Sequence, residues 1–145
     1  MSIIIHKKIN KETKTEVLKA VEQSMILSNW KRYVKGKKVF IKTNLLIKKV
    51  VPGLCTSPWV IEGIINVLKK ENKEIYIGDC NVATTKQVEE AAKNWGIIAL
   101  CKKYDIKFVN LLGDVAHKKA KYKRIPQLIF NSSLNIRKQF IKGYI

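Results

Sequence analysis

The chain has 145 residues, of which 46% are hydrophobic and 28% are charged, and its formal net charge is +18. This composition is typical of a single globular domain and excludes a disordered, collagen-like or Pro-rich chain. The longest apolar runs, such as residues 45–47 and 97–100, are too short to cross a bilayer, and the N-terminus lacks the pattern of a secretion signal. We therefore expect a cytoplasmic protein with no membrane partner.

The positive charge by itself suggests a polyanionic partner. Its source weakens that inference, because 26 of the 29 basic residues are Lys, 3 are Arg, and Ile is also abundant at 20 residues. A joint excess of Lys and Ile is typical of codon bias, whereas proteins that read nucleic acids usually rely on the Arg guanidinium. A non-enzymatic, Lys-rich nucleic-acid-binding module therefore stands as an alternative that the composition does not favour.

The first half of the chain alternates predicted strands and helices. Ser2–His6 contains an unbroken Ile run, which is typical of a strand buried on both faces. A helix follows from about Glu12, and Lys38–Lys42 is the next predicted strand. Ser57 and Pro58 open a second helix, because Ser is a favoured N-cap and Pro fits the first helical position. The expected apolar stripes of these helices are Val17, Leu18, Val21 and Met25, and Val60, Ile61, Ile64, Ile65 and Leu68.

The second half repeats this alternation. Glu74–Asp79 is a predicted strand, and the sequence from Thr84 to Gln87 has the spacing of a capping box for the helix after it. A short helix over Ile97–Tyr104 and a strand over Ile106–Leu111 follow. The expected core residues of the capped helix are Val88, Ala91, Ala92 and Trp95, and Trp30 and Trp59 are also expected to pack.

The order of these elements predicts an α/β fold. Strands joined by connections of more than a dozen residues are expected to run parallel, with right-handed crossovers. We expect a mainly parallel sheet of about four strands with flanking helices, similar to a three-layer sandwich, over residues 1–114. Residues 115–145 hold eight basic and no acidic residues with weak periodicity, so we expect an irregular, divergent and poorly ordered tail.

Several polar residues follow the predicted strands, where open α/β sheets bind their ligands. Lys42 and Asn44 would share one face of an extended strand and could hold an oxyanion, or they are a solvated Lys and a turn residue. Thr56 and Ser57 precede a helix, so they form an anion site or a plain N-cap. Asp79 could bind a metal, orient a base or pair with Lys42.

The cysteines offer a weaker hypothesis. The chain has three cysteines, Cys55, Cys80 and Cys101, which are widely spaced and form no C-x-x-C pair. This odd number and this spacing exclude a disulfide framework, a zinc ribbon or a ferredoxin-type site within the chain. Cys55 and Cys80 could meet as a thiolate or metal site, although a small buried Cys is more often a packing residue. The chain also lacks the G-x-G-x-x-G, P-loop and H-E-x-x-H motifs.

Three ordered segments carry a family resemblance: K-V-F-I-K-T-N-L-L, then P-G-L-C-T-S-P-W-V-I, then E-I-Y-I-G-D. Over about residues 37–112 they resemble the domain of unknown function 362 family, whose members are often described as uncharacterised iron–sulfur-centre proteins. Many relatives carry [4Fe–4S] clusters in an additional module. This chain has no such Cys clusters, so no cofactor is expected within it. The resemblance points to Lys42, Asn44, Thr56, Pro58, Gly78 and Asp79.

The chain departs from the family pattern in two places. Thr43 stands where the family has Pro, and the family's later Pro-Lys-x-Lys-Thr-His-like segment has no counterpart after Pro126. The resemblance therefore implies an N-terminal fragment of a longer domain, completed by a missing C-terminal half or a partner chain.

These inferences together predict an anionic-ligand or metal-linked site at the ends of the strands. Its expected residues are Lys42, Asn44, Thr56, Ser57 and Asp79. Neither the residues nor the resemblance assigns a reaction type.

Overall fold

The fold was analysed in a computed structural model, which describes residues 4–80, 88–111, 131, 133–135 and 137–138. A parallel sheet with the order β1-β2-β3 lies at its centre, formed by β1 (Lys38–Lys42), β2 (Glu74–Asp79) and β3 (Lys107–Asn110). Lys42 is in register with Gly78, so the ends of β1 and β2 lie side by side. The predicted α/β class and parallel sheet are confirmed, with three described strands in place of about four.

The predicted N-terminal strand is not found in residues 4–6, which form no regular element; residues 1–3 lie outside the described part. Ile4 is 92% exposed, the opposite of the burial that the Ile run predicts. A β-branched run favours the extended conformation, but a strand also needs a neighbouring edge to pair with, and local sequence carries no information about that edge.

One α-helix precedes β1 and another follows it. The first, α1 (Lys14–Leu27), begins after Thr13, whose side-chain oxygen accepts a hydrogen bond from the Glu16 N–H at 3.4 Å. It ends before Asn29, whose φ of 51° breaks the helix, and the short 3-10 helix η1 (Trp30–Arg32) follows. The second helix, α2 (Pro58–Lys70), begins at the predicted Pro.

Two short helices, α3 (Val88–Asn94) and α4 (Ile97–Lys103), lie between β2 and β3. Gly96 separates them with a φ of 77°, a conformation that costs Gly little. The predicted capping box at Thr84 and Gln87 falls outside the described residues. Most of the predicted irregular tail does too, although residues 134–135 and 137–138 are helical.

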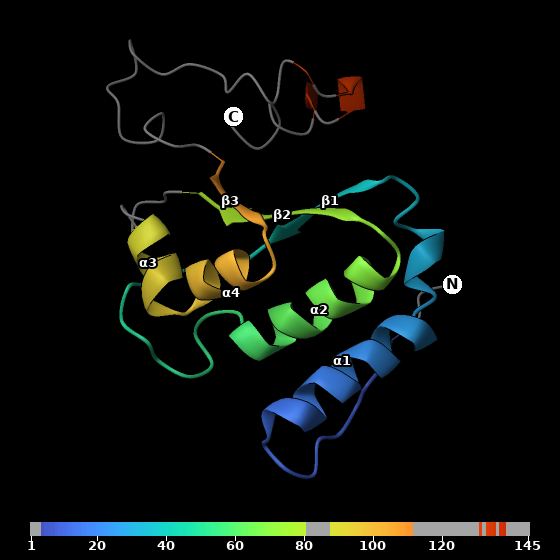
Figure 1. Ribbon diagram of the computed structural model, residues 1–145, viewed down its shortest axis with the longest axis vertical. Helices are drawn as coiled ribbons and strands as arrows, with labels where there is room; N and C mark the ends of the chain where they lie inside the picture. The colour runs from blue at the N-terminus through green and yellow to red at the C-terminus, as the bar shows by residue number, and fades with distance from the viewer. Residues whose placement is uncertain (1–3, 81–87, 112–130, 132, 136, 139–145) are drawn as a thin grey trace.

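The four helices α1 to α4 lie on the same side of the sheet (Figure 1). On that side of the sheet, α2 packs against β2 and α4 packs against β3. The helix α1 packs mainly against α2. This arrangement differs in detail from the expected sandwich, in which helices flank the sheet.

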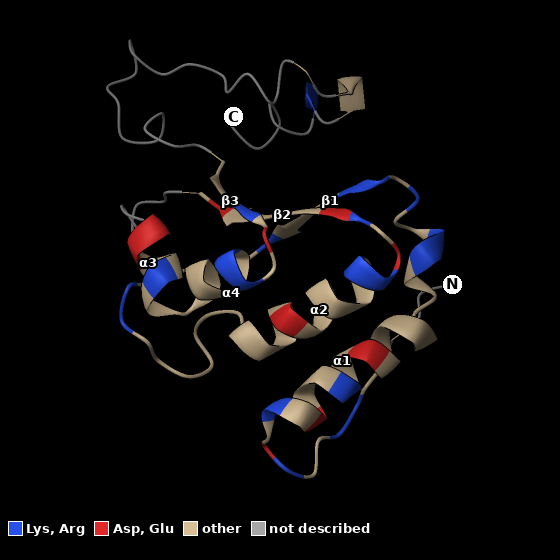
Figure 2. Ribbon diagram, in the orientation of Figure 1, with Lys and Arg blue, Asp and Glu red and all other residues tan. Residues whose placement is uncertain are grey.

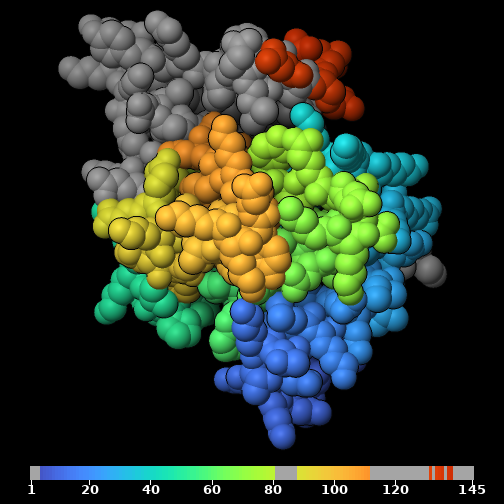
Figure 3. Space-filling view, in the orientation of Figure 1, coloured from blue at the N-terminus to red at the C-terminus, as the bar shows by residue number. Residues whose placement is uncertain are grey.

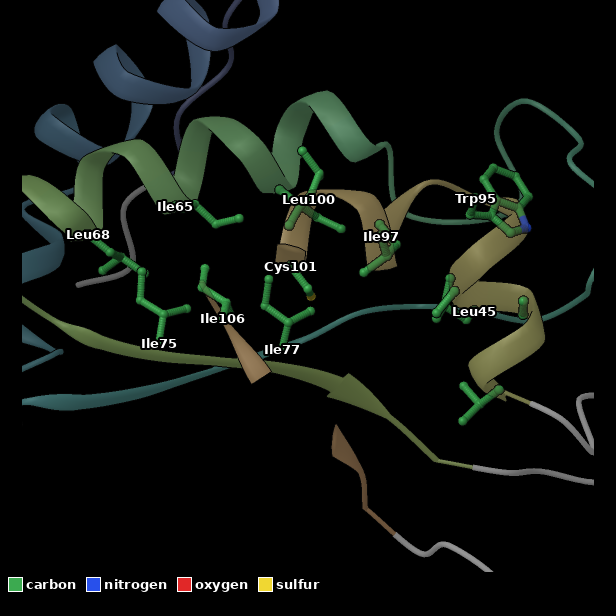
Figure 4. Packing of buried hydrophobic residues seen from close by; sticks show 14 of the residues in the cluster. Leu45, Ile65, Leu68, Ile75, Ile77, Trp95, Ile97, Leu100, Cys101 and Ile106 are labelled. Carbon is green, nitrogen blue, oxygen red and sulfur yellow. The ribbon is translucent and has the colours of Figure 1, made fainter. Parts of the chain in front are cut away.

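The core lies between the sheet and the α2–α4 layer, as Figure 4 shows. Buried aliphatic side chains of α2 meet those of β2, and the predicted stripe of α3 is buried as well. The labelled core residues are Leu45, Ile65, Leu68, Ile75, Ile77, Trp95, Ile97, Leu100, Cys101 and Ile106. Trp30 and Trp95 are buried as expected, at 8% and 7% exposure.

The expectation that Trp59 packs in the core is wrong, because its side chain is 41% exposed. Successive helical residues are rotated by about 100°, so Trp59 lies about 200° around α2 from the buried Ile61. Trp59 therefore faces away from the layer of side chains that covers the sheet.

Two glycines allow close approaches that a side chain would prevent. A Cβ at Gly78 would lie 2.0 Å from the Val109 carbonyl oxygen, so β2 and β3 can pair here only without one. A Cβ at Gly63 would lie 2.8 Å from the Val21 Cβ, so Gly63 sets the close contact of α1 with α2.

Candidate functional site

The candidate site, called the rim below, consists of Lys42, Asn44, Thr56, Ser57 and Asp79. Lys42 ends β1, Asp79 ends β2, and Ser57 precedes α2. Since β1 and β2 are parallel, their carboxyl ends meet at one edge of the sheet. The loop after β1 then returns to the start of α2, which brings the remaining rim residues to the same edge.

Asp79 organises the rim. Its carboxylate Oδ2 accepts a hydrogen bond from the Leu45 N–H at 2.8 Å, and its Oδ1 accepts one from the Cys80 N–H at 2.9 Å. The Lys42 Nζ lies 3.3 Å from the same Oδ1, and the Asp79 side chain is only 8% exposed. Of the roles left open for Asp79, pairing with Lys42 is the one present in the structure.

The loop after β1 is held to both neighbouring elements. Thr43 is 1% exposed, and its N–H and hydroxyl both donate to the Gly78 carbonyl, at 2.9 and 3.1 Å. Asn44 donates its N–H to the Thr56 Oγ1 at 3.0 Å and accepts from the Thr56 N–H at 3.2 Å. These bonds tie the end of β1 to the residues that lead into α2.

Ser57 occupies the N-cap position of α2, as the sequence predicts, but its side chain makes no capping hydrogen bond. Its carbonyl accepts the Ile61 N–H at 3.1 Å, which begins the helical pattern. The first N–H groups of a helix have no acceptor within the helix, and Pro58 has no N–H. In this turn Trp59 and Val60 therefore carry the N–H groups that lack an intrahelical acceptor.

Lys42 has an exposed side chain, with 61% of its surface open to solvent. Its ammonium donates to the Thr43 carbonyl at 3.0 Å and lies beside Asp79. An ammonium has three N–H donors, so two acceptors leave one donor directed to solvent. Asn44 is also exposed.

The surroundings of Cys80 and Cys101 disfavour the thiolate form of these two side chains. Burial is the largest cause that raises the pKa of the Cys80 thiol, and the neighbouring Asp79 carboxylate raises it further. Burial also raises the pKa of Cys101. Cys55 is half-buried and packs against the core. Within the described ranges, no group of three or more His, Cys, Asp or Glu side chains is placed to hold a metal ion.

Glu62 is a buried charged residue that the sequence analysis missed. It lies on α2 with its side chain 3% exposed, and it forms ion pairs with Lys14 of α1 at 2.6 Å and Lys103 of α4 at 2.7 Å. The Tyr104 hydroxyl donates to it at 3.0 Å. The sequence does carry a signal for this burial, because Glu62 is a single carboxylate that stands between Ile61 and Ile64 of the predicted apolar stripe.

These partners decide the charge of Glu62. Burial, the largest single cause, would raise the pKa of Glu62, but the hydrogen bonds from Lys103, Lys14 and Tyr104 together lower it from 4.5 to about 2. Glu62 is therefore ionised at neutral pH, and it joins three helical segments rather than serving as a proton donor.

Lys and Arg are spread over helices, strands and loops, with fewer acidic residues among them, as Figure 2 shows for the described chain. Seven Lys side chains form ion pairs with Asp or Glu: Lys14, Lys31, Lys38, Lys42, Lys48, Lys70 and Lys103. This distribution gives no specific support to the nucleic-acid alternative.

An α/β fold with a polar rim at the ends of its parallel strands is therefore the class of protein that the structure defines. The model of the family described as domain of unknown function (DUF362) matches residues 39–140, which is most of the chain. The chain belongs to this family. The match continues to residue 140, beyond residue 112, where the motif resemblance ends.

No curated protein and no solved structure matched the chain significantly. No described helix is both long and apolar enough to span a membrane. The departure at Thr43 is compatible with the rim, because Thr43 donates an N–H to the Gly78 carbonyl that a Pro could not supply.

Proposed function

We propose that this member of the family binds a small anionic ligand, carrying a phosphate or a carboxylate, at the rim. Lys42 and Asn44 would contact the anion from the end of β1, and Thr56, Ser57 and the first turn of α2 from the opposite side. The observation that supports the proposal is the hydrogen-bond network that ties these donors together around a buried Asp79.

In this proposal Asp79 is a positioning residue. Its carboxylate already accepts from two backbone N–H groups and pairs with Lys42, so it holds the rim in shape. A metal ion bound to Asp79 would have to displace Lys42, whereas an anion could join Lys42 on its exposed side. The arrangement therefore favours an anion over a metal-linked ligand.

The start of α2 adds donors that attract negative charge. Backbone N–H groups of the first helical turn and the positive end of the helix dipole together favour anions. The Ser57 hydroxyl is not engaged in capping, so it can donate to a ligand. Since Lys42 and Asn44 are exposed, we further propose that a partner chain or a further segment covers the bound ligand.

The test is a titration of the ¹⁵N-labelled protein with inorganic phosphate and with acetate, followed by amide chemical shifts. We expect the amides of Asn44, Trp59 and Val60 to shift in a saturable way. Charge-assisted hydrogen bonds contribute about 1.5–3 kcal/mol, so Lys42→Gln is expected to weaken binding about tenfold or more.

Lys38→Gln is the matched control. Lys38 lies at the other end of β1 and also faces a carboxylate, since its Nζ is 3.9 Å from Glu74. It is expected to leave the affinity nearly unchanged. Shifts that do not saturate, or equal losses in the two variants, would show that the anion senses only the overall charge, and the rim proposal would then be wrong.

A further inference from the structure

A second concave site lies away from the rim, on the side of α2 that faces α1. An open groove of about 840 Å³ runs between α1, the C-terminal half of α2 and the end of α4. Figure 3 shows the face on which these three segments meet. The groove and the rim are separate sites, because the rim lies at the start of α2 beside Ser57, whereas the groove is lined by α2 residues between Gly63 and Lys70.

Part of the lining of the groove is apolar. Leu18 of α1, Val67 of α2 and the ring of Tyr104 line it, together with Gly63. The Asn66 side chain supplies a polar group in the same wall. Pockets of a few hundred to about 1,000 Å³ with apolar walls and a few convergent polar groups are typical of small-molecule sites.

The rest of the lining is largely charged, with more basic than acidic residues. Four Lys side chains line it, Lys19, Lys69, Lys70 and Lys103, against the acidic Glu22 and Asp105. Lys70 pairs with Glu22, and Lys103 pairs with the buried Glu62, so these two are already neutralised locally. Lys19 and Lys69 have no ion-pair partner among the residues that the structure describes, and they are the cations left for a ligand.

We propose that this groove binds a small amphipathic anion, with its apolar body against Leu18, Val67 and Tyr104 and its carboxylate or phosphate at Lys19 and Lys69. The apolar part of the lining and the two Lys side chains without a described ion-pair partner are complementary to the two ends of such a molecule. Because α1 precedes residues 39–140, the groove includes an element outside the family match.

The proposal is tested by titrating the full chain with octanoate and with octyl phosphate, and by following amide shifts. We expect saturable shifts at Leu18, Val67 and Tyr104, and the tighter of the two probes identifies the preferred head group. Octanol lacks the charge and acetate lacks the apolar body, so each is expected to bind at least about tenfold more weakly than octanoate if both ends are recognised.

The double variant Lys19→Gln/Lys69→Gln is expected to weaken octanoate binding about tenfold. The control Lys35→Gln/Lys49→Gln removes the same charge from exposed positions outside the groove, and it is expected to change the affinity less than about twofold. Leu18→Ala should weaken octanoate and leave the rim response to phosphate unchanged. Shifts confined to other surfaces, or equal effects of the two double variants, would overturn the proposal without affecting the rim.

Discussion

The buried Glu62 gives the sharpest prediction about stability, through the substitution Glu62→Gln. The amide keeps the size of the side chain but removes the negative charge that Lys14 and Lys103 share. The pKa of Glu62 falls from 4.5 to about 2 in the folded protein, which corresponds to about 3.5 kcal/mol at roughly 1.4 kcal/mol for each pKa unit. Because Lys14 and Lys103 are 45% and 57% exposed, solvent screens them, and we expect a loss of about 2 kcal/mol.

The loss should depend on pH with a definite sign. A carboxylate whose pKa is lower in the folded than in the unfolded state stabilises the fold above the unfolded pKa. The contribution of Glu62 is therefore present in full above about pH 5 and disappears as the pH falls from 4.5 towards 2. The free-energy difference between wild type and Glu62→Gln should shrink over the same interval.

The assay is urea denaturation followed by the fluorescence of the buried Trp30 and Trp95, at pH 7 and at intervals down to pH 3. The control is Glu71→Gln, which removes a more exposed ion pair with Lys31 and is expected to cost less than about 0.5 kcal/mol. If the cost of Glu62→Gln were the same at pH 7 and pH 3, it would come from packing, and the ionic argument would be refuted.

Three further predictions concern the sheet and the rim. Asp79→Ala leaves the Leu45 and Cys80 N–H groups without their acceptor, so unfolding measurements should show a loss of about 3 kcal/mol, and a loss under 1 kcal/mol would contradict the organising role. Gly78→Ala places a Cβ 2.0 Å from the Val109 oxygen and should lower the thermal midpoint sharply, whereas Gly36→Ala, with its nearest atom at 3.8 Å, should not. The raised pKa of Cys80 predicts slower alkylation by iodoacetamide at pH 7.5 than that of free cysteine, as measured by mass spectrometry, and an equal rate would argue against it.

The sequence predicts the helices well because their signals are local. The stripes of α2 and α3 recur at helical spacing, Pro58 marks a helix start, and Gly96 divides α3 from α4. Each of these signals depends on residues within one or two turns. The parallel sheet also follows from the length of the connections between strands.

The sequence predicts that the rim residues share one edge of the sheet, and the structure places Lys42 beside Asp79 there. That ligands lie at the carboxyl ends of parallel strands is a rule of topology, so Lys42 and Asp79 could be placed together before any contact was known. The hydrogen bonds from the Leu45 and Cys80 N–H groups to Asp79 could not be predicted from the sequence, because they depend on how the loop after β1 turns back over the end of β2.

What the sequence alone determined is therefore the α/β class, the helices α1 to α4, three of the four predicted strands and the edge of the sheet at which Lys42 and Asp79 meet, since periodicity and connection length carry that information. The tertiary structure decided which surfaces meet. Ile4 has no strand partner in the described chain, Trp59 faces away from the core, and Glu62 is buried among cations from α1 and α4. The physical reason is that burial and pairing depend on neighbours far away in the chain, and a residue's own sequence context does not specify them.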